Sequence, residues 1–168
     1  LYLNGATVHA VDLNEKLIEA GKAHALYNKL DINYEVCSSK TLATQRANEF
    51  DLVVCSELIE HVQELEGLLN DCRLLLKDDG VLIISTINRT LVALIFAIIA
   101  AEKVLKIIPD GTHNHDLFVK PNELANLARN IGFDCKDVTG FSYNPLTRRA
   151  KFSSSLSINY LATFTKFR

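Results

Sequence analysis

The sequence of 168 residues contains no methionine and no tryptophan, and its first residue is Leu1. A chain without methionine has no initiator residue. The opening from Leu1 to Val8 has the pattern of a helix end, a glycine cap at Gly5 and the start of a strand. Because this pattern belongs in the middle of a domain, we expect a further segment upstream of Leu1.

Other absences exclude classes of protein. The four cysteines form no C-x-x-C pair, which argues against zinc knuckles and redox motifs. The net charge of -2 and the lack of a basic stripe predict no nucleic-acid partner. The longest apolar run, Leu91 to Ala101, is well short of the roughly 20 residues that a bilayer span needs.

The remaining composition is that of an ordinary globular chain. It is 48% hydrophobic and 23% charged, and its length suits one domain, so we predict a single, partial domain over residues 1–168. The hydrophobic pattern predicts strands over residues 7–12, 32–37, 51–55, 81–87, 133–138 and 158–166. It predicts helices over residues 15–30, 40–47, 65–76, 90–108 and 121–130.

The alternation of strands and helices predicts an α/β fold, a Rossmann-like, mostly parallel sheet covered on both faces. The last strand has no helix before it. We therefore expect the loop from Gly140 to Leu156 to bring it back antiparallel to the strand at 133–138. The segment Lys77–Gly80 is predicted to be a turn.

The most informative segment is Asp51–Val62, where a short apolar strand ends in Ser56, Glu57, Glu60 and His61. Ligands of open α/β sheets bind outside the carboxyl ends of strands. If a helical turn starts near Ser56, Glu57 lies next to both Glu60 and His61. These three side chains then suit a divalent metal, with His61 alternatively acting as a general base. The plain alternative is a serine N-cap followed by acids that the helix dipole favours.

Asp12 ends the first predicted strand and precedes a helix. An acid at that point can accept hydrogen bonds from both hydroxyls of a ribose, as in nucleoside sites. The alternative is a helix N-cap. The histidines of Gly111–His115 and the cations of Tyr143–Arg149 are interpreted as polar surface, although the second segment also suits an anionic ligand.

The order of these features resembles class I S-adenosylmethionine-dependent methyltransferases. Five motifs narrow the resemblance to the ubiquinone-biosynthesis O-methyltransferase family: Ser56–Val62, Ser85–Arg89, Pro109–His113, Tyr143–Pro145 and Ile158–Tyr160. The family's first strand and glycine-rich loop have no counterpart in this chain. We therefore expect the full-length parent to be the enzyme, and the 168-residue piece to bind cofactor poorly.

The resemblance implies methylation of a catechol-type hydroxyl on a polyprenylated ubiquinone precursor, with S-adenosylmethionine as donor. It places Asp12 on the ribose and Ser56 beside the cofactor. It assigns Glu57, Glu60 and His61 to catalysis and to a divalent metal such as magnesium. The rival interpretations are another small-molecule methyltransferase, with a carbon, nitrogen or carboxyl acceptor, and a non-catalytic interaction subunit.

The resemblance also implies partners and a location. The apolar helix predicted from Leu91 to Ile108 is expected to lie on a lipid surface, where Lys103, Lys106, Arg148 and Arg149 meet anionic headgroups. The alternative is a helix that is buried in the core or lies at a subunit interface. We expect peripheral attachment to the cytoplasmic side of a bacterial inner membrane, or alternatively to the matrix side of the mitochondrial inner membrane. Other ubiquinone-biosynthesis enzymes are further expected partners.

Overall fold

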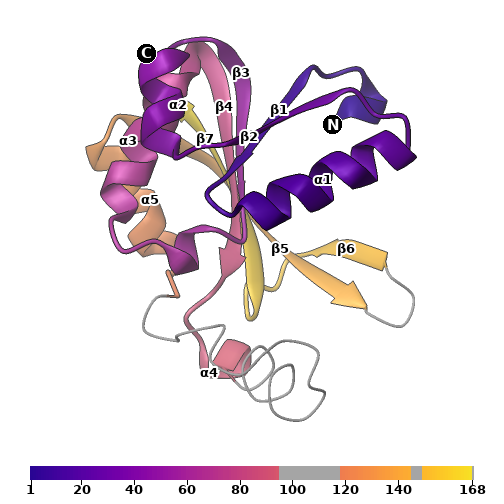
Figure 1. Ribbon diagram of the computed structural model, residues 1–168. Helices are drawn as coiled ribbons and strands as arrows, with labels where there is room; N and C mark the ends of the chain where they lie inside the picture. Colours follow the sequence, from indigo (N-terminus) through magenta and orange to yellow (C-terminus); the bar gives the residue numbers. More distant parts are fainter. Residues whose placement is uncertain (95–117, 145–148, 168) are drawn as a thin grey trace. The chain divides into compact units, whose positions relative to one another are not determined.

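The computed structural model describes residues 1–94, 118–144 and 149–167 of the chain (Figure 1). The chain divides into two compact units, Leu1–Arg46 and Ala47–Arg168. The prediction of one domain over the whole chain stays a prediction. The predicted α/β class with an antiparallel last strand is confirmed, since helices alternate with strands in both units.

The first unit is a two-stranded parallel sheet with two helices. In chain order it contains η1 (Tyr2–Asn4), β1 (Val8–Asp12), α1 (Glu15–Tyr27), β2 (Ile32–Val36) and α2 (Ser39–Gln45). The side chain of Asn14 caps α1 by accepting the backbone N–H of Lys16 at 3.0 Å. A Cβ at Gly21 would lie 2.6 Å from Cε1 of Tyr34, so α1 packs closely on β2 only with glycine there.

A partly buried histidine links the elements of the first unit. The Nδ1 atom of His9 on β1 lies 2.9 Å from both Arg46 Nη1 and Asn33 Nδ2. Its Nε2 atom lies 3.1 Å from an oxygen of Glu35 on β2. Because Nδ1 accepts from two donors, the ring proton lies on Nε2 and is donated to Glu35. This network joins both strands to Arg46, the residue that caps the C-terminus of α2.

The second unit is built on a five-stranded sheet in the order β3-β4-β7-β5-β6. Its strands are β3 (Phe50–Ser56), β4 (Leu76–Ile87), β5 (Phe133–Asn144), β6 (Arg149–Ser153) and β7 (Asn159–Lys166). Its helices are η2 (Ile59–His61), α3 (Leu65–Leu75), α4 (Leu91–Ala93) and α5 (Pro121–Asn130). The β3 strand is parallel to β4. The β7 strand runs antiparallel to β4 and, as predicted, to β5.

Two predictions about this unit need correction, and a third falls mostly outside the described residues. Part of the loop predicted from Gly140 to Leu156 instead forms a hairpin of β5 with β6, an edge strand whose first four residues are exposed. The segment Lys77–Gly80 lies within β4, where pairing passes from Phe50–Leu76 to Leu52–Val81, so the predicted turn is an irregularity of the strand. Of the helix predicted over 90–108, residues 90–94 are described, and Leu91–Ala93 form the helix α4.

The core of the second unit lies between the sheet and the helices α3 and α5. The buried side chains come from both helices and from β4, β5 and β7, and they include Leu69, Leu82, Ile84, Leu124, Phe133, Tyr160 and Phe164. The rings of Phe133 and Phe164 lie 6.2 Å apart between centroids. This packing holds β3 and β4 rigidly in register, which positions the residues at their carboxyl ends.

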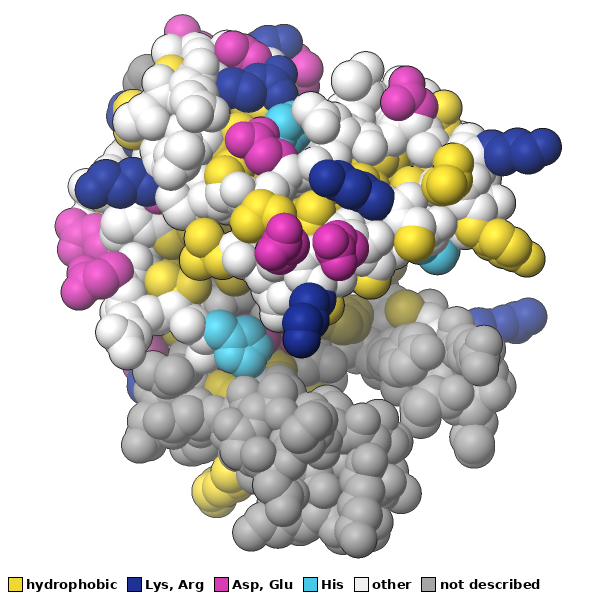
Figure 2. Space-filling view, viewed as in Figure 1, with side chains coloured by type: hydrophobic (Ala, Val, Ile, Leu, Met, Phe, Trp, Pro, Cys, Tyr) yellow, Lys and Arg dark blue, Asp and Glu magenta, His cyan; other side chains and the backbone are white. Residues whose placement is uncertain are grey.

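Large apolar side chains also remain at the surface. On the first unit, Leu17 is 58% exposed, Leu26 82% and Tyr27 88%. Figure 2 shows hydrophobic side chains interspersed with acidic and basic ones on the face in view. None of the helices within the described ranges has the length and apolarity that a membrane crossing requires.

Candidate active site

Polar residues gather at the carboxyl ends of β3 and β4. The two strands are parallel neighbours, and Ser56 at the end of β3 pairs with Ser85 on β4. The hydroxyl oxygens of these serines lie 3.1 Å apart. Since both strands end on the same edge, the residues that follow Ser56 reach the last residues of β4. This edge is the place where open α/β sheets bind ligands.

Glu57 adopts an unusual backbone conformation directly after β3. Its φ is 48°, in the left-handed region that non-glycine residues rarely occupy. Its N–H donates to the carbonyl oxygen of Ser85 at 2.9 Å, which holds the turn in place. The next helical residues are the short η2 turn, Ile59–His61. The expectation of a helical turn from Ser56 is therefore wrong, and Ser56 is a strand residue and no N-cap, because the left-handed turn interrupts helical geometry.

The carboxylate of Glu57 is held by β4. The hydroxyl of Ser85 donates to Glu57 Oε1 at 3.0 Å. Partial burial of the carboxyl and the neighbouring Glu60 carboxylate raise the pKa of Glu57 to about 7, while the bond from Ser85 opposes the shift. Two carboxylates that share a site in this way resist ionising together, so the site retains a proton or attracts a cation near neutral pH.

Glu60 is almost completely buried, with 1% of its surface exposed. The hydroxyl of Thr86 on β4 donates to Glu60 Oε2 at 2.7 Å. Within the described part of the chain, the buried Oε1 atom has no hydrogen-bond partner. Leaving a buried acceptor unpaired is unfavourable by about 1–3 kcal/mol or more. A hydrogen-bond donor or a cation bound at this oxygen would therefore be stabilising.

These observations test whether the predicted metal fits. Oxygen donors, an unpaired buried carboxylate oxygen and a second carboxylate close to it suit a hard cation such as magnesium. In residues 1–94, 118–144 and 149–167, however, no three acidic, histidine or cysteine side chains gather as a metal site would require. The structure thus places the Glu57 carboxyl beside that of Glu60, and His61 is exposed. The assignment of all three to a metal stays a prediction.

Asp12 lies in the first unit, at the exposed end of β1. Its Oδ1 atom accepts the backbone N–H of Asn14 at 2.7 Å, which fixes the carboxylate over the turn into α1. The helix cap is Asn14, so the interpretation of Asp12 as the N-cap is wrong: it stands two residues too early. Its role on a ribose stays a prediction, as does the place of Ser56 beside the cofactor.

Sequence reasoning missed Ser85, Thr86 and Tyr160 as parts of this site. The buried Tyr160 pairs with Thr86 across the β4–β7 ladder, and its hydroxyl donates to the carbonyl oxygen of Val119 at 2.9 Å. Burial, with Glu60 and Glu123 nearby, raises the pKa of Tyr160. The motif Ser85–Arg89 contributed to the resemblance, but strand patterning alone gave it no role.

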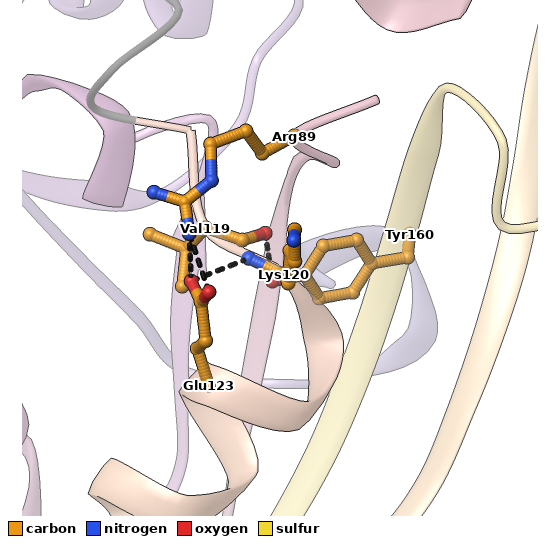
Figure 3. Close-up of polar contacts among 5 residues, drawn as sticks. All are labelled: Arg89, Val119, Lys120, Glu123 and Tyr160. Carbon is orange, nitrogen blue, oxygen red and sulfur yellow. Dashed lines mark hydrogen bonds and ion pairs between the residues drawn. The ribbon is translucent and has the colours of Figure 1, made fainter. Parts of the chain in front are cut away.

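The residues after β4 tie the site to the rest of the unit. The backbone N–H of Asn88 donates to the carbonyl of Ile158 at 2.7 Å, and its side-chain amide donates to that of Leu156 at 2.7 Å. Figure 3 shows Arg89 donating to both carboxylate oxygens of Glu123, near the start of α5. These bonds join the end of β4 to α5 and to the chain entering β7. The predicted motifs Pro109–His113 and Tyr143–Pro145 lie wholly or partly outside the described residues.

Comparison with known proteins places the chain in a family. A family model described as a methyltransferase domain matches residues 1–84. Ubiquinone biosynthesis O-methyltransferase of Coxiella burnetii (strain RSA 331) is 40% identical over 162 residues, 96% of this chain and 69% of that protein. The protein of the same name from Colwellia psychrerythraea is 38% identical over 157 residues, covering 94% of this chain but only 64% of the relative.

Solved structures show the same fold at low sequence identity. An S-adenosylmethionine-dependent methyltransferase from Clostridium acetobutylicum matches with a TM-score of 0.69 and 12% identity, covering 100% of this chain and 78% of that one. Magnesium protoporphyrin IX methyltransferase from Synechocystis matches with a TM-score of 0.67 and 16% identity, over 98% of this chain and 66% of that one. At this level of identity the likeness concerns the fold alone.

Proposed function

The chain belongs to the S-adenosylmethionine-dependent methyltransferases, in the family of the ubiquinone biosynthesis O-methyltransferases, and we propose that the full-length protein methylates a catechol-type hydroxyl of a polyprenylated ubiquinone precursor. The observation that carries the proposal is the 40% identity over 96% of this chain. The resemblance in motifs and the acidic site at the ends of β3 and β4 support the same activity.

The chemistry assigns a task to each part of the site. S-adenosylmethionine, when bound, supplies a methyl group on a positively charged sulfur. Asp12 would accept hydrogen bonds from the ribose hydroxyls, and Ser56 would lie beside the cofactor. The chain must hold a catechol oxygen in line with the methyl carbon and remove its proton, because the ionised oxygen is the stronger nucleophile. His61 would accept that proton, since imidazole serves widely as a general base.

Glu57 and Glu60 would hold the divalent cation, for which magnesium is the first candidate. The support is the unpaired buried Oε1 atom of Glu60 beside a carboxyl whose pKa is raised to about 7. A cation in that place would lower the pKa of the catechol hydroxyls and orient both oxygens. A substrate with two neighbouring hydroxyls suits such a site better than one with a single hydroxyl.

We also propose that the protein works at a membrane surface, on the cytoplasmic side of a bacterial inner membrane or the matrix side of the mitochondrial one. The support lies at the start of the apolar run, where Leu91 is 74% exposed and Val92 is 42% exposed. A helix that lies in the bilayer interface would let the polyprenyl tail remain in the membrane. Most of the segment Leu91–Ile108, together with Lys103, Lys106 and Arg148, lies outside the described residues.

The direct test is methyl transfer by the full-length protein, measured by mass spectrometry. We expect methylation at oxygen of a catechol that carries a short prenyl chain. The matched substrate with one of its two hydroxyls removed should react far more slowly. We expect the activity to fall in EDTA and to return with magnesium. Transfer to a carbon or nitrogen atom, or no transfer to the catechol, would contradict the proposal.

The membrane proposal has its own test. Full-length protein should sediment with vesicles containing anionic phospholipid. Replacing Leu91 and Val92 together by glutamate should release it while the circular dichroism spectrum stays unchanged, because both side chains are exposed. Equal sedimentation of the variant and the wild type would count against this part of the chain as the contact.

A further inference from the structure

Two adjacent residues of β4 bind two different carboxylates. Ser85 donates to Glu57 Oε1 at 3.0 Å, and Thr86 donates to Glu60 Oε2 at 2.7 Å. Successive side chains of a strand point to opposite faces of the sheet. The turn that carries Glu57 and Glu60 therefore lies across the carboxyl end of β4, and each acid is held from a different face of the strand.

The hydroxyls of Ser85 and Thr86 each fix one oxygen of a glutamate carboxylate. Thr86 is fully buried, and its bond to Oε2 leaves the other oxygen of Glu60 without a partner within the described chain. Ser85 is 9% exposed and also accepts the backbone N–H of Glu57 at 3.3 Å, so it holds both the side chain and the strained turn. A carboxylate that is bound at one oxygen has a defined orientation for its second oxygen.

We propose that Ser85 and Thr86 are positioning residues that orient Glu57 and Glu60 so that their carboxylates together bind a divalent cation. This inference rests on the cation of the proposed function. The hydroxyls do not touch the cation. They hold the acids in the required orientation before it binds, which removes the need to order two flexible side chains during binding.

The variant Thr86→Val tests this role because it removes the hydroxyl and retains the shape of the side chain. Thr86→Ser keeps the hydroxyl and should rescue binding. Thr165→Val is the matched control, since Thr165 pairs with Val81 at the opposite end of the same β4–β7 ladder. Full-length protein is titrated with manganese(II), and the free ion is measured by electron paramagnetic resonance in the absence of substrate.

We expect manganese affinity to fall about tenfold or more in Thr86→Val, the usual loss when a residue that orients a metal ligand is removed. Thr86→Ser and Thr165→Val should bind manganese with an affinity within about twofold of the wild type, a much smaller change than the roughly tenfold loss expected for Thr86→Val. In methyl transfer, Thr86→Val should need more magnesium for half-maximal rate yet approach the wild-type kcat at saturating magnesium. A purely structural role would not move the magnesium requirement in this way.

Equal manganese affinity in Thr86→Val and the wild type would overturn the inference, and so would a wild type that binds no manganese. If Thr86→Val does not fold, Ser85→Ala replaces it, since Ser85 lies nearer the surface: weaker binding then supports the inference, and unchanged binding overturns it. Failure of the proposed function is a separate outcome. In that case the wild type binds manganese in a Thr86-dependent manner but methylates no catechol.

Discussion

Each of the two units contains a group of polar side chains, and the groups differ in how completely their hydrogen bonds are satisfied. In the first unit, both ring nitrogens of His9 have partners, which come from Glu35, Asn33 and Arg46. In the second unit, Glu60 Oε1 and Asn88 Oδ1 are buried without a partner among the described residues. The turn at Glu57 adds backbone strain to that site.

This difference separates a structural network from a candidate site. A satisfied network stabilises the fold, and its removal leaves buried groups unpaired. An unsatisfied group and a strained turn are unfavourable in the free protein, and such features concentrate where a ligand completes the missing interactions. The comparison therefore predicts opposite responses to mutation: lost stability in the first unit, and lost function with little lost stability at the ends of β3 and β4.

The largest effect is expected at Glu60. In Glu60→Gln the amide oxygen can still accept from Thr86, but the negative charge is gone. Methyl transfer should fall about 100-fold or more, because a cation that stabilises the reacting oxygen is worth several kcal/mol. Unfolding in urea should show equal or greater stability, since a buried, half-paired charge is removed. A destabilised but fully active variant would contradict the comparison.

The next largest effect is expected at His9. In His9→Ala, the side chains of Arg46 and Glu35 lose a partly buried partner, and the free energy of unfolding should fall by about 2–3 kcal/mol. The measurement is urea unfolding of the full-length protein, with His24→Ala on the exposed face of α1 as control. The manganese affinity of folded His9→Ala should remain unchanged. A network without a stabilising role would leave the two histidine variants equally stable.

Asp12 sharpens the comparison because it is the one residue of the first unit with a predicted functional role. Asp12→Ala should weaken S-adenosylmethionine binding by about 1.5–3 kcal/mol, the usual contribution of hydrogen bonds to a charged group. Calorimetry on the full-length protein measures this directly. Asn14→Ala, which removes the helix cap and keeps the acid, is the control and should change stability more than affinity. Unchanged affinity in Asp12→Ala would remove it from the cofactor site.

The smallest effect concerns pH. Burial and Glu60 raise the pKa of Glu57 from about 4.5 to about 7 in the folded protein, so between these values the folded state binds more protons than the unfolded state. Stability should therefore decrease as pH rises from about 4.5 to about 7, and the slope should be shallower in Glu57→Gln. Urea unfolding in the absence of divalent cations at several pH values tests this. Identical slopes in both proteins would show that the pKa of Glu57 is not raised in the folded protein.

Much of the fold was predictable from local patterns. The strands and helices around Asp12, and the helix beginning at Pro121, were predicted to within a few residues, because apolar periodicity and capping residues are properties of short segments. The β6 strand was missed although Arg149–Ser153 alternates polar and apolar residues, because so short a run is a weak signal and its place at the sheet edge depends on pairing with β5. The turn predicted at Lys77–Gly80 is wrong, because these residues lie inside β4, where pairing with β3 shifts register and then continues.

At the candidate site, the sequence by itself identified which acids follow β3, because a strand that ends in polar residues is visible in composition and order. It also carried the family resemblance that the comparisons confirm. The conformation of Glu57 and the partners of both acids depend instead on Ser85 and Thr86, which are 28 and 26 residues away in the chain. Only the tertiary structure brings such distant residues together, because strand pairing aligns the carboxyl ends of β3 and β4.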